Sequence, residues 1–267
     1  MKRTERIVAC ALFLVALLCM PMSSLAQSPF DGTWHNNMSA AKLSPKPTVS
    51  YLSQGWYHCV SCTPSFDVKA DGQDQPVTGQ SYDTLSVHEV DAKTLAFTAK
   101  KAGTVTFEQT RTVSADGKTL TVKTTSHPMN GGDDPVIATV VATLEGKAPL
   151  GVHATSGSWK LIKVQTSDNA NDTTYKMNGD ELTMTDPTGE SFTAKLDGSD
   201  APMNGSYSVD TVSLKKIDAH TIEETDKRGG TVTGVAKMTV SPDGKKLTRV
   251  YTSKPSERVT TYVETKK

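Results

Sequence analysis

The chain has 267 residues, and its 29 Lys and Arg balance its 29 Asp and Glu, so the formal net charge is zero. Nucleic-acid binding needs a concentrated positive field, and this neutral chain has no long basic run, so we expect no nucleic acid among its partners. The length allows one large domain or two of medium size.

The first 26 residues are typical of a secretory signal peptide. A basic start at residues 2–6 precedes the apolar run Ile7 to Met20, and small residues fit cleavage after Ala26. The run is too short to span a membrane, which takes about 20 residues. We therefore expect a secreted or periplasmic protein with no integral membrane segment in the mature chain. A lipoprotein signal at Cys19 is the alternative, although Leu18 stands where a small residue should precede that cysteine.

An internal repeat sets the domain organisation. Residues 83–121 recur at 210–248 with a constant shift of 127 positions, and roughly half of the aligned residues are identical. Asp83-Thr84-Leu85-Ser86 returns as Asp210-Thr211-Val212-Ser213, for example. The repeat predicts a first domain over residues 28–147, a linker over 148–156 and a second domain over 157–267.

The mature chain predicts strands throughout, because short alternating runs are separated by Asp-Gly turns. From Thr104 to Val113 the alternation places Val105, Gln109 and Arg111 on one face and a Thr-rich set, including Thr104 and Thr106, on the solvent face. The expected strands of the first repeat are 30–36, 48–53, 56–59, 66–70, 84–90, 95–100, 104–114, 118–125 and 136–144, and residues 258–264 close the second repeat.

Eight to ten strands per repeat are enough to close a sheet and remove its exposed edges. The fold class is therefore all-β, with two tandem antiparallel up-and-down β-barrels of about 8–10 strands each. A β-sandwich with the same number of strands is the alternative.

Each repeat opens on a Gly-x-Trp motif, Gly32-Thr33-Trp34 and Gly157-Ser158-Trp159, and the second ends in Thr261-Tyr262-Val263-Glu264-Thr265-Lys266. This arrangement resembles the lipocalins and the fatty-acid-binding proteins, together called calycins. The resemblance covers nearly the whole mature chain and implies two tandem barrels that bind small apolar or amphipathic molecules. Fatty-acid-binding proteins hold a ligand carboxylate with Arg-x-Tyr in their final strand; the nearest match here, Arg249-Val250-Tyr251, lies one strand earlier.

An Arg that points into a small barrel can orient the acidic head group of an apolar ligand. Arg249 and Tyr251 share one strand face and are ligand-binding candidates in the second barrel, as are Arg111 and Gln109 in the first. The alternative is that these faces point outward or that side chains fill the lumen. Trp34 and Trp159 are expected in the core, closing the barrels.

Cys59 and Cys62 are the only cysteines of the mature chain, and they lie on a turn. In an oxidising compartment this spacing favours a local disulfide. A metal site with His58, or a redox-active pair, is the alternative, but no fourth ligand is near in sequence and no helix is predicted that would lower a thiol pKa.

No catalytic constellation or cofactor motif is present, so we expect neither an enzyme nor a cofactor. The sequence predicts an exported, non-enzymatic, lipocalin-like protein that binds small hydrophobic or amphipathic molecules. The alternative is a structural or interaction module of the cell envelope, with solid barrels and binding by loops such as residues 37–47 and 129–135. A barrel enzyme or redox protein that uses the Cys59/Cys62 turn is a third hypothesis.

Overall fold

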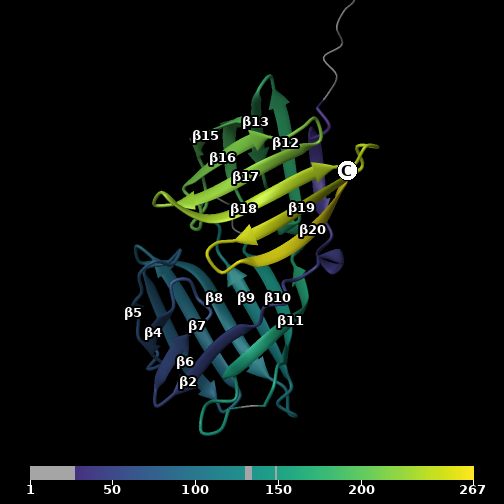
Figure 1. The fold of residues 1–267 in the computed structure, drawn as a ribbon. Coiled ribbons are helices and arrows are strands. Elements are labelled where there is room, and N and C mark those ends of the chain that lie inside the picture. Colours follow the sequence, from purple (N-terminus) through teal and green to yellow (C-terminus); the bar gives the residue numbers. More distant parts are fainter. Residues whose placement is uncertain (1–27, 130–133, 148) are drawn as a thin grey trace, which may run out of the picture.

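A computed structural model describes residues 28–129, 134–147 and 149–267. The signal peptide and part of the loop at 129–135 lie outside these residues. The chain is all-β, as predicted, and forms two antiparallel sheets of ten strands that each curl into a nearly closed barrel (Figure 1). Two short 3-10 turns, η1 (Met38–Ala40) and η2 (Asp168–Ala170), lie where the chain passes from one barrel to the other.

The first barrel consists of strands β2 to β11, in the order β4-β3-β2-β11-β10-β9-β8-β7-β6-β5. Their bounds are β2 (Thr48–Ser53), β3 (Trp56–Cys59), β4 (Phe66–Lys69), β5 (Gln75–Pro76), β6 (Thr84–Asp91), β7 (Thr94–Lys101), β8 (Thr104–Val113), β9 (Thr119–Ser126), β10 (Val136–Leu144) and β11 (Gly157–Thr166).

The second barrel consists of β1 together with β12 to β20, in the order β14-β13-β12-β1-β20-β19-β18-β17-β16-β15. Their bounds are β1 (Gly32–Asn36), β12 (Asp172–Asn178), β13 (Glu181–Thr185), β14 (Ser191–Lys195), β15 (Asp197–Pro202), β16 (Thr211–Lys216), β17 (Thr221–Arg228), β18 (Thr231–Val240), β19 (Lys246–Ser253) and β20 (Arg258–Lys266).

The two repeats exchange their first strands, so the barrels do not follow the predicted boundaries 28–147 and 157–267. Strand β1 pairs with β12 and β20, while β11 of the second repeat pairs with β10 and β2 (Figure 1). The first barrel is therefore one continuous segment that is inserted between β1 and the rest of the second barrel. Both strands carry Gly-x-Trp and occupy equivalent positions in their two sheets. The sequence repeat alone therefore does not reveal the exchange.

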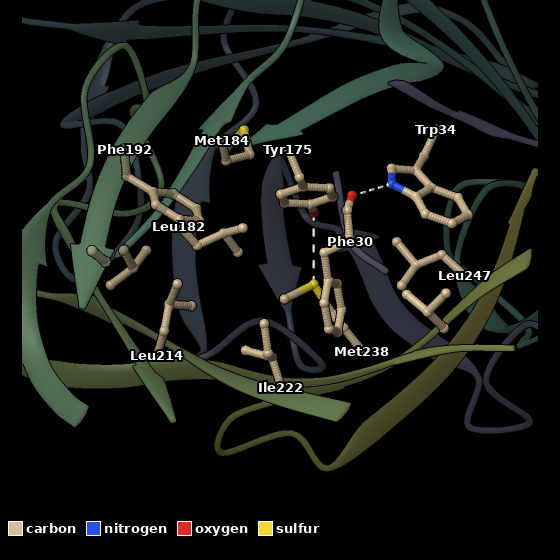
Figure 2. Packing of buried hydrophobic residues seen from close by; sticks show 13 residues of the cluster. Phe30, Trp34, Tyr175, Leu182, Met184, Phe192, Leu214, Ile222, Met238 and Leu247 are labelled. Atoms are coloured by element: carbon tan, nitrogen blue, oxygen red, sulfur yellow. Dashed lines mark hydrogen bonds between the residues drawn. The ribbon is translucent and has the colours of Figure 1, made fainter. Parts of the chain in front are cut away.

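Each barrel closes over a tryptophan of the Gly-x-Trp motif, and both tryptophans are fully buried, as expected for core residues. Trp34 Nε1 donates to the Phe30 carbonyl over 2.8 Å in the second barrel, and Trp159 Nε1 donates to the Thr155 carbonyl over 2.9 Å in the first. Figure 2 shows Trp34 at one side of the second barrel's core, which extends through Phe30 and Leu182 to Phe192. Burial of these large apolar side chains supplies most of the stabilisation.

One predicted face assignment is wrong. Strand β8 has a bulge, because Ala99 pairs with Phe107 whereas Lys100 pairs with Val105. The additional residue, Thr106, turns inward, is buried and donates to the Ala99 carbonyl over 3.3 Å. The rest of the Thr-rich face is exposed, as predicted.

Within the described ranges, no helix has the length and apolar character that a membrane crossing needs.

Candidate functional site

The first barrel contains an interior cavity of about 320 Å³. Its polar wall carries two guanidinium groups, a phenol, an amide and hydroxyls, and among the described residues it carries no Asp or Glu. The apolar wall includes Leu120, Val122, Val140, Ala142, Trp159 and Leu161, and the polar wall includes Thr48, Ser50, Tyr57, Gln109, Arg111 and Arg258.

Arg111 on β8 points into this cavity, and all its partners are neutral. Its Nε donates to Gln109 Oε1 over 2.7 Å, and its Nη1 donates to the Tyr57 hydroxyl over 2.7 Å and to Ser50 Oγ over 3.5 Å. The guanidinium also lies 4.5 Å from the centre of the Phe97 ring. Arg111 forms no ion pair with any described carboxylate, so its positive charge is held in place but not neutralised.

A smaller compartment of about 60 Å³ adjoins the cavity on the other side of Arg111. Tyr82 and Phe107 meet edge to face in its wall with ring centres 5.5 Å apart, and burial raises the pKa of Tyr82 to about 12. Cys59 and Cys62 are joined by a disulfide that borders both compartments. The disulfide ties the chain after β3 to the cavity wall.

The interior of the second barrel also contains an arginine, but there the charge is neutralised. Arg249 on β19 donates from Nη2 to the Tyr175 hydroxyl over 2.5 Å, and its Nε lies 3.3 Å from Oε1 of buried Glu264. Burial disfavours the charged guanidinium, but Tyr175 and the nearby carboxylates more than offset this and raise the pKa of Arg249 above its ordinary value.

Two further carboxyl groups face Arg249 from β17. Glu224 and Asp226 are both buried and hydrogen-bond to each other. Two carboxyl groups can share a hydrogen bond only when one of them is protonated. Burial first, and then the charge of Asp226, raise the pKa of Glu224 from 4.5 to about 7, while burial also raises the pKa values of Asp226 and Glu264.

Strand register shows where the two barrels differ. Gly157 lies opposite Ser50 and Gly32 lies opposite Tyr175, so these two hydroxyl-bearing residues occupy equivalent positions, and each accepts a hydrogen bond from the arginine of its barrel. Leu120 lies opposite Ala142 and its counterpart Leu247 lies opposite Glu264. Ala142 of the cavity wall thus stands where the second barrel has its carboxylate. Phe97 and Ala99 likewise correspond to Glu224 and Asp226, which lie 127 positions later in the second copy of the repeat.

Stability is expected to fall as the pH rises through 7, because the folded protein holds the Glu224 proton more tightly than the unfolded chain, whose Glu pKa is 4.5. This contribution is complete below pH 4.5 and is lost above the folded pKa, by up to about 3 kcal/mol. Hydrogen bonds lower the pKa values of four exposed carboxyl groups, those of Asp116, Asp197, Asp218 and Asp243. The stability that these groups contribute is lost only when they become protonated, below about pH 4.

Thermal unfolding between pH 5 and pH 9 tests this expectation. Glu224→Gln should flatten the decline and be more stable than wild type at pH 9, whereas Glu223→Gln, on the other face of β17, should leave the profile unchanged. An identical decline in Glu224→Gln and wild type would assign the pH dependence to other groups.

The structure brings Arg111 and Gln109 together beside the cavity and turns Arg249 into the second barrel. Tyr251 also faces that interior, where its ring fills the space that Gly234 leaves and its hydroxyl donates a hydrogen bond to Asp226. The sequence pattern did not predict Tyr57, Tyr175 or the three buried carboxyl groups. One signal was available, because the second copy carries Glu224 and Asp226 where the first carries Phe97 and Ala99.

A larger cavity of about 600 Å³ lies at the end of the second barrel, between the chain before β1 and two hairpin turns. Its wall carries the two carboxylates of Asp31 and Asp218 and the single amine of Lys216, so it does not favour an anion. Across the residues that the structure describes, no group of three or more His, Cys, Asp or Glu is arranged to hold a metal ion.

Comparison with known proteins does not assign the chain to a family: no family model matches it, and a search of curated proteins finds no match.

Proposed function

We propose that the protein is an exported, non-enzymatic, lipocalin-like binding protein whose first barrel holds a small amphipathic anion. One observation carries the proposal: Arg111 is positively charged and has no carboxylate partner among the described residues, and the wall of its cavity carries no acidic side chain. The cavity, about 320 Å³, is at the lower end of the range for ligand sites, which begins near 300 Å³.

Charge and shape together define the ligand class. A partly buried cation without a counter-ion is costly, and an anionic ligand removes that cost. Gln109 and Tyr57 fix the guanidinium, so little side-chain freedom is lost when an anion binds. The apolar wall from Leu120 to Leu161 suits a hydrocarbon or aromatic body.

The second barrel is proposed to be structural. Its arginine is already paired with Glu264 and hydrogen-bonded to Tyr175, and Tyr251 occupies the space next to Gly234. This arrangement supports, for that half of the molecule, the alternative of a solid interaction module of the cell envelope. A ligand role for Arg249 and Tyr251 stays a prediction that the internal ion pairs disfavour.

Ala142→Glu tests the proposal by placing in the first barrel the carboxylate that the second barrel has at the equivalent position. We expect the new carboxylate to neutralise Arg111 and to weaken decanoate binding at least tenfold, because a charge-assisted hydrogen bond contributes about 1.5–3 kcal/mol. Isothermal titration calorimetry with decanoate on the purified mature protein provides the measurement.

Ala142→Gln is the matched control, since it adds nearly the same volume without the charge and should retain more of the affinity. Decanol, which has the same chain without the acid, should bind weakly and respond equally to both substitutions. Failure of wild type to bind decanoate or any of several other amphipathic anions would refute the proposal.

A further inference from the structure

A second arginine, Arg258, lines the cavity of the first barrel although it belongs to the second. It is the first residue of β20, and its two terminal nitrogens donate to the backbone carbonyls of Lys46 and Pro47, just before β2 begins. The strand exchange brings this about, because the segment from β1 to β2 crosses from one barrel to the other and packs along β20, where Lys42 and Thr261 form a β-bridge.

Arg258 has no acidic partner among the described residues. Burial lowers its pKa, and no neighbouring charge opposes that effect. This contrasts with Arg249, whose pKa the surrounding carboxylates raise. The two backbone carbonyls orient the guanidinium but carry no net charge, so a second positive charge at the cavity wall is fixed and not neutralised.

The two guanidinium groups come from β8 and β20, and both contact the chain at the start of β2 or just before it. Arg258 is anchored at Pro47, next to Thr48, and Arg111 contacts Ser50. Thr48 and Ser50 both line the cavity, and two residues of a strand span about 7 Å. A single small ligand is therefore long enough to reach both groups.

We propose that the ligand of this cavity carries two negative charges, one met by Arg111 and the other by Arg258 of the second barrel. This inference rests on the proposed function and specifies its ligand as a dianionic amphiphile. The two charges belong either to one head group, as in a phosphate monoester, or to two carboxylates. In either case the second barrel contributes a cation to the site of the first, which makes the tandem arrangement part of the binding site.

Two pairs of probes that differ in charge test the proposal and distinguish the two forms of the ligand. Octyl phosphate is compared with octyl sulfate near pH 8.5, where the phosphate is a dianion, and octanedioate is compared with octanoate. Calorimetry on the full mature chain should show about tenfold tighter binding of the dianion in at least one pair, since the added charge gains a charge-assisted contact. Arg258→Gln should remove this preference for the dianion, whereas Arg258→Lys should retain part of it.

Each result has one reading. A preference in the phosphate pair identifies a dianionic head group, and a preference in the dicarboxylate pair identifies charges at two ends. Equal binding of dianion and monoanion in both pairs, or a preference that survives Arg258→Gln in a folded variant, overturns this inference alone. If none of the four anions binds, the proposed function fails with it. Thermal unfolding verifies that the Arg258 variants are folded.

Discussion

A fragment covering residues 48–167 is expected to fold by itself as a closed barrel, whereas the fragment 28–147, of equal length, is not. The first fragment contains all ten strands of the first sheet, from β2 to β11, and includes Ser167, whose backbone and side chain hydrogen-bond to Ile137. The second fragment corresponds to the sequence repeat but lacks β11, the strand that joins β10 to β2.

The missing strand accounts for the size of the expected difference. Without β11, β10 and β2 have open edges inside the sheet, and the buried Trp159 is lost from the core. Strand β1 carries the same motif, but it has 5 residues against the 10 of β11, so it cannot pair with the whole of β10 even when it takes the vacant place.

Chemical denaturation with near-ultraviolet circular dichroism compares the two fragments. We expect a cooperative transition for 48–167 and a lower midpoint, or association into larger species, for 28–147. The fragment 48–167 should bind decanoate but show no preference for dianions, because it lacks Arg258. Equal stability of two monomeric fragments would contradict the exchanged arrangement.

Replacing Arg249 with Met is expected to lower the free energy of unfolding by about 3–5 kcal/mol, because it leaves buried carboxylates without their cation. Glu264 lies 3.3 Å from the guanidinium, and Glu224 and Asp226 also face it. In the described part of the chain, one oxygen each of Glu264 and Asp226 has no hydrogen-bond partner. Removing the arginine would therefore leave these two oxygens with neither a hydrogen bond nor a nearby cation.

Arg111→Met is the matched comparison and should cost about 1 kcal/mol at most, since its partners Gln109, Tyr57 and Ser50 are neutral and border a cavity. It should instead abolish decanoate binding. Adding Glu264→Leu to Arg249→Met should recover much of the lost stability, because it removes one of the uncompensated groups. If the two single substitutions destabilise the protein equally, the assignment of one arginine to structure and the other to binding is wrong.

The pattern of the sequence was sufficient to predict the strands but not their partners. Period-two alternation and Asp-Gly turns located strands such as β8 and β9, and the same alternation placed Gln109 and Arg111 together on the inner face. The bulge at Thr106 escaped this reasoning, because an additional residue in a strand changes the face of its neighbours without changing the composition.

The difference between the two interior arginines could not be read from one strand. Whether such a charge is free or neutralised depends on side chains from other strands, and Glu264, Glu224 and Arg249 come from β20, β17 and β19. Their meeting depends on the register of the closed sheet. Residue-by-residue comparison of the two repeats nonetheless shows carboxylates in the second at positions that are apolar in the first.

The exchange of β1 and β11 also determines the order in which the protein can be completed as it is made. The first barrel has all its strands once Thr166 has been synthesised, and a complete unit of this kind can fold while later residues are still being added. Strand β1 precedes all of these residues, yet its neighbours are β12 and the C-terminal strand β20. Strand β1 can therefore gain its first native partner only after β12 has been made, and its second only after β20.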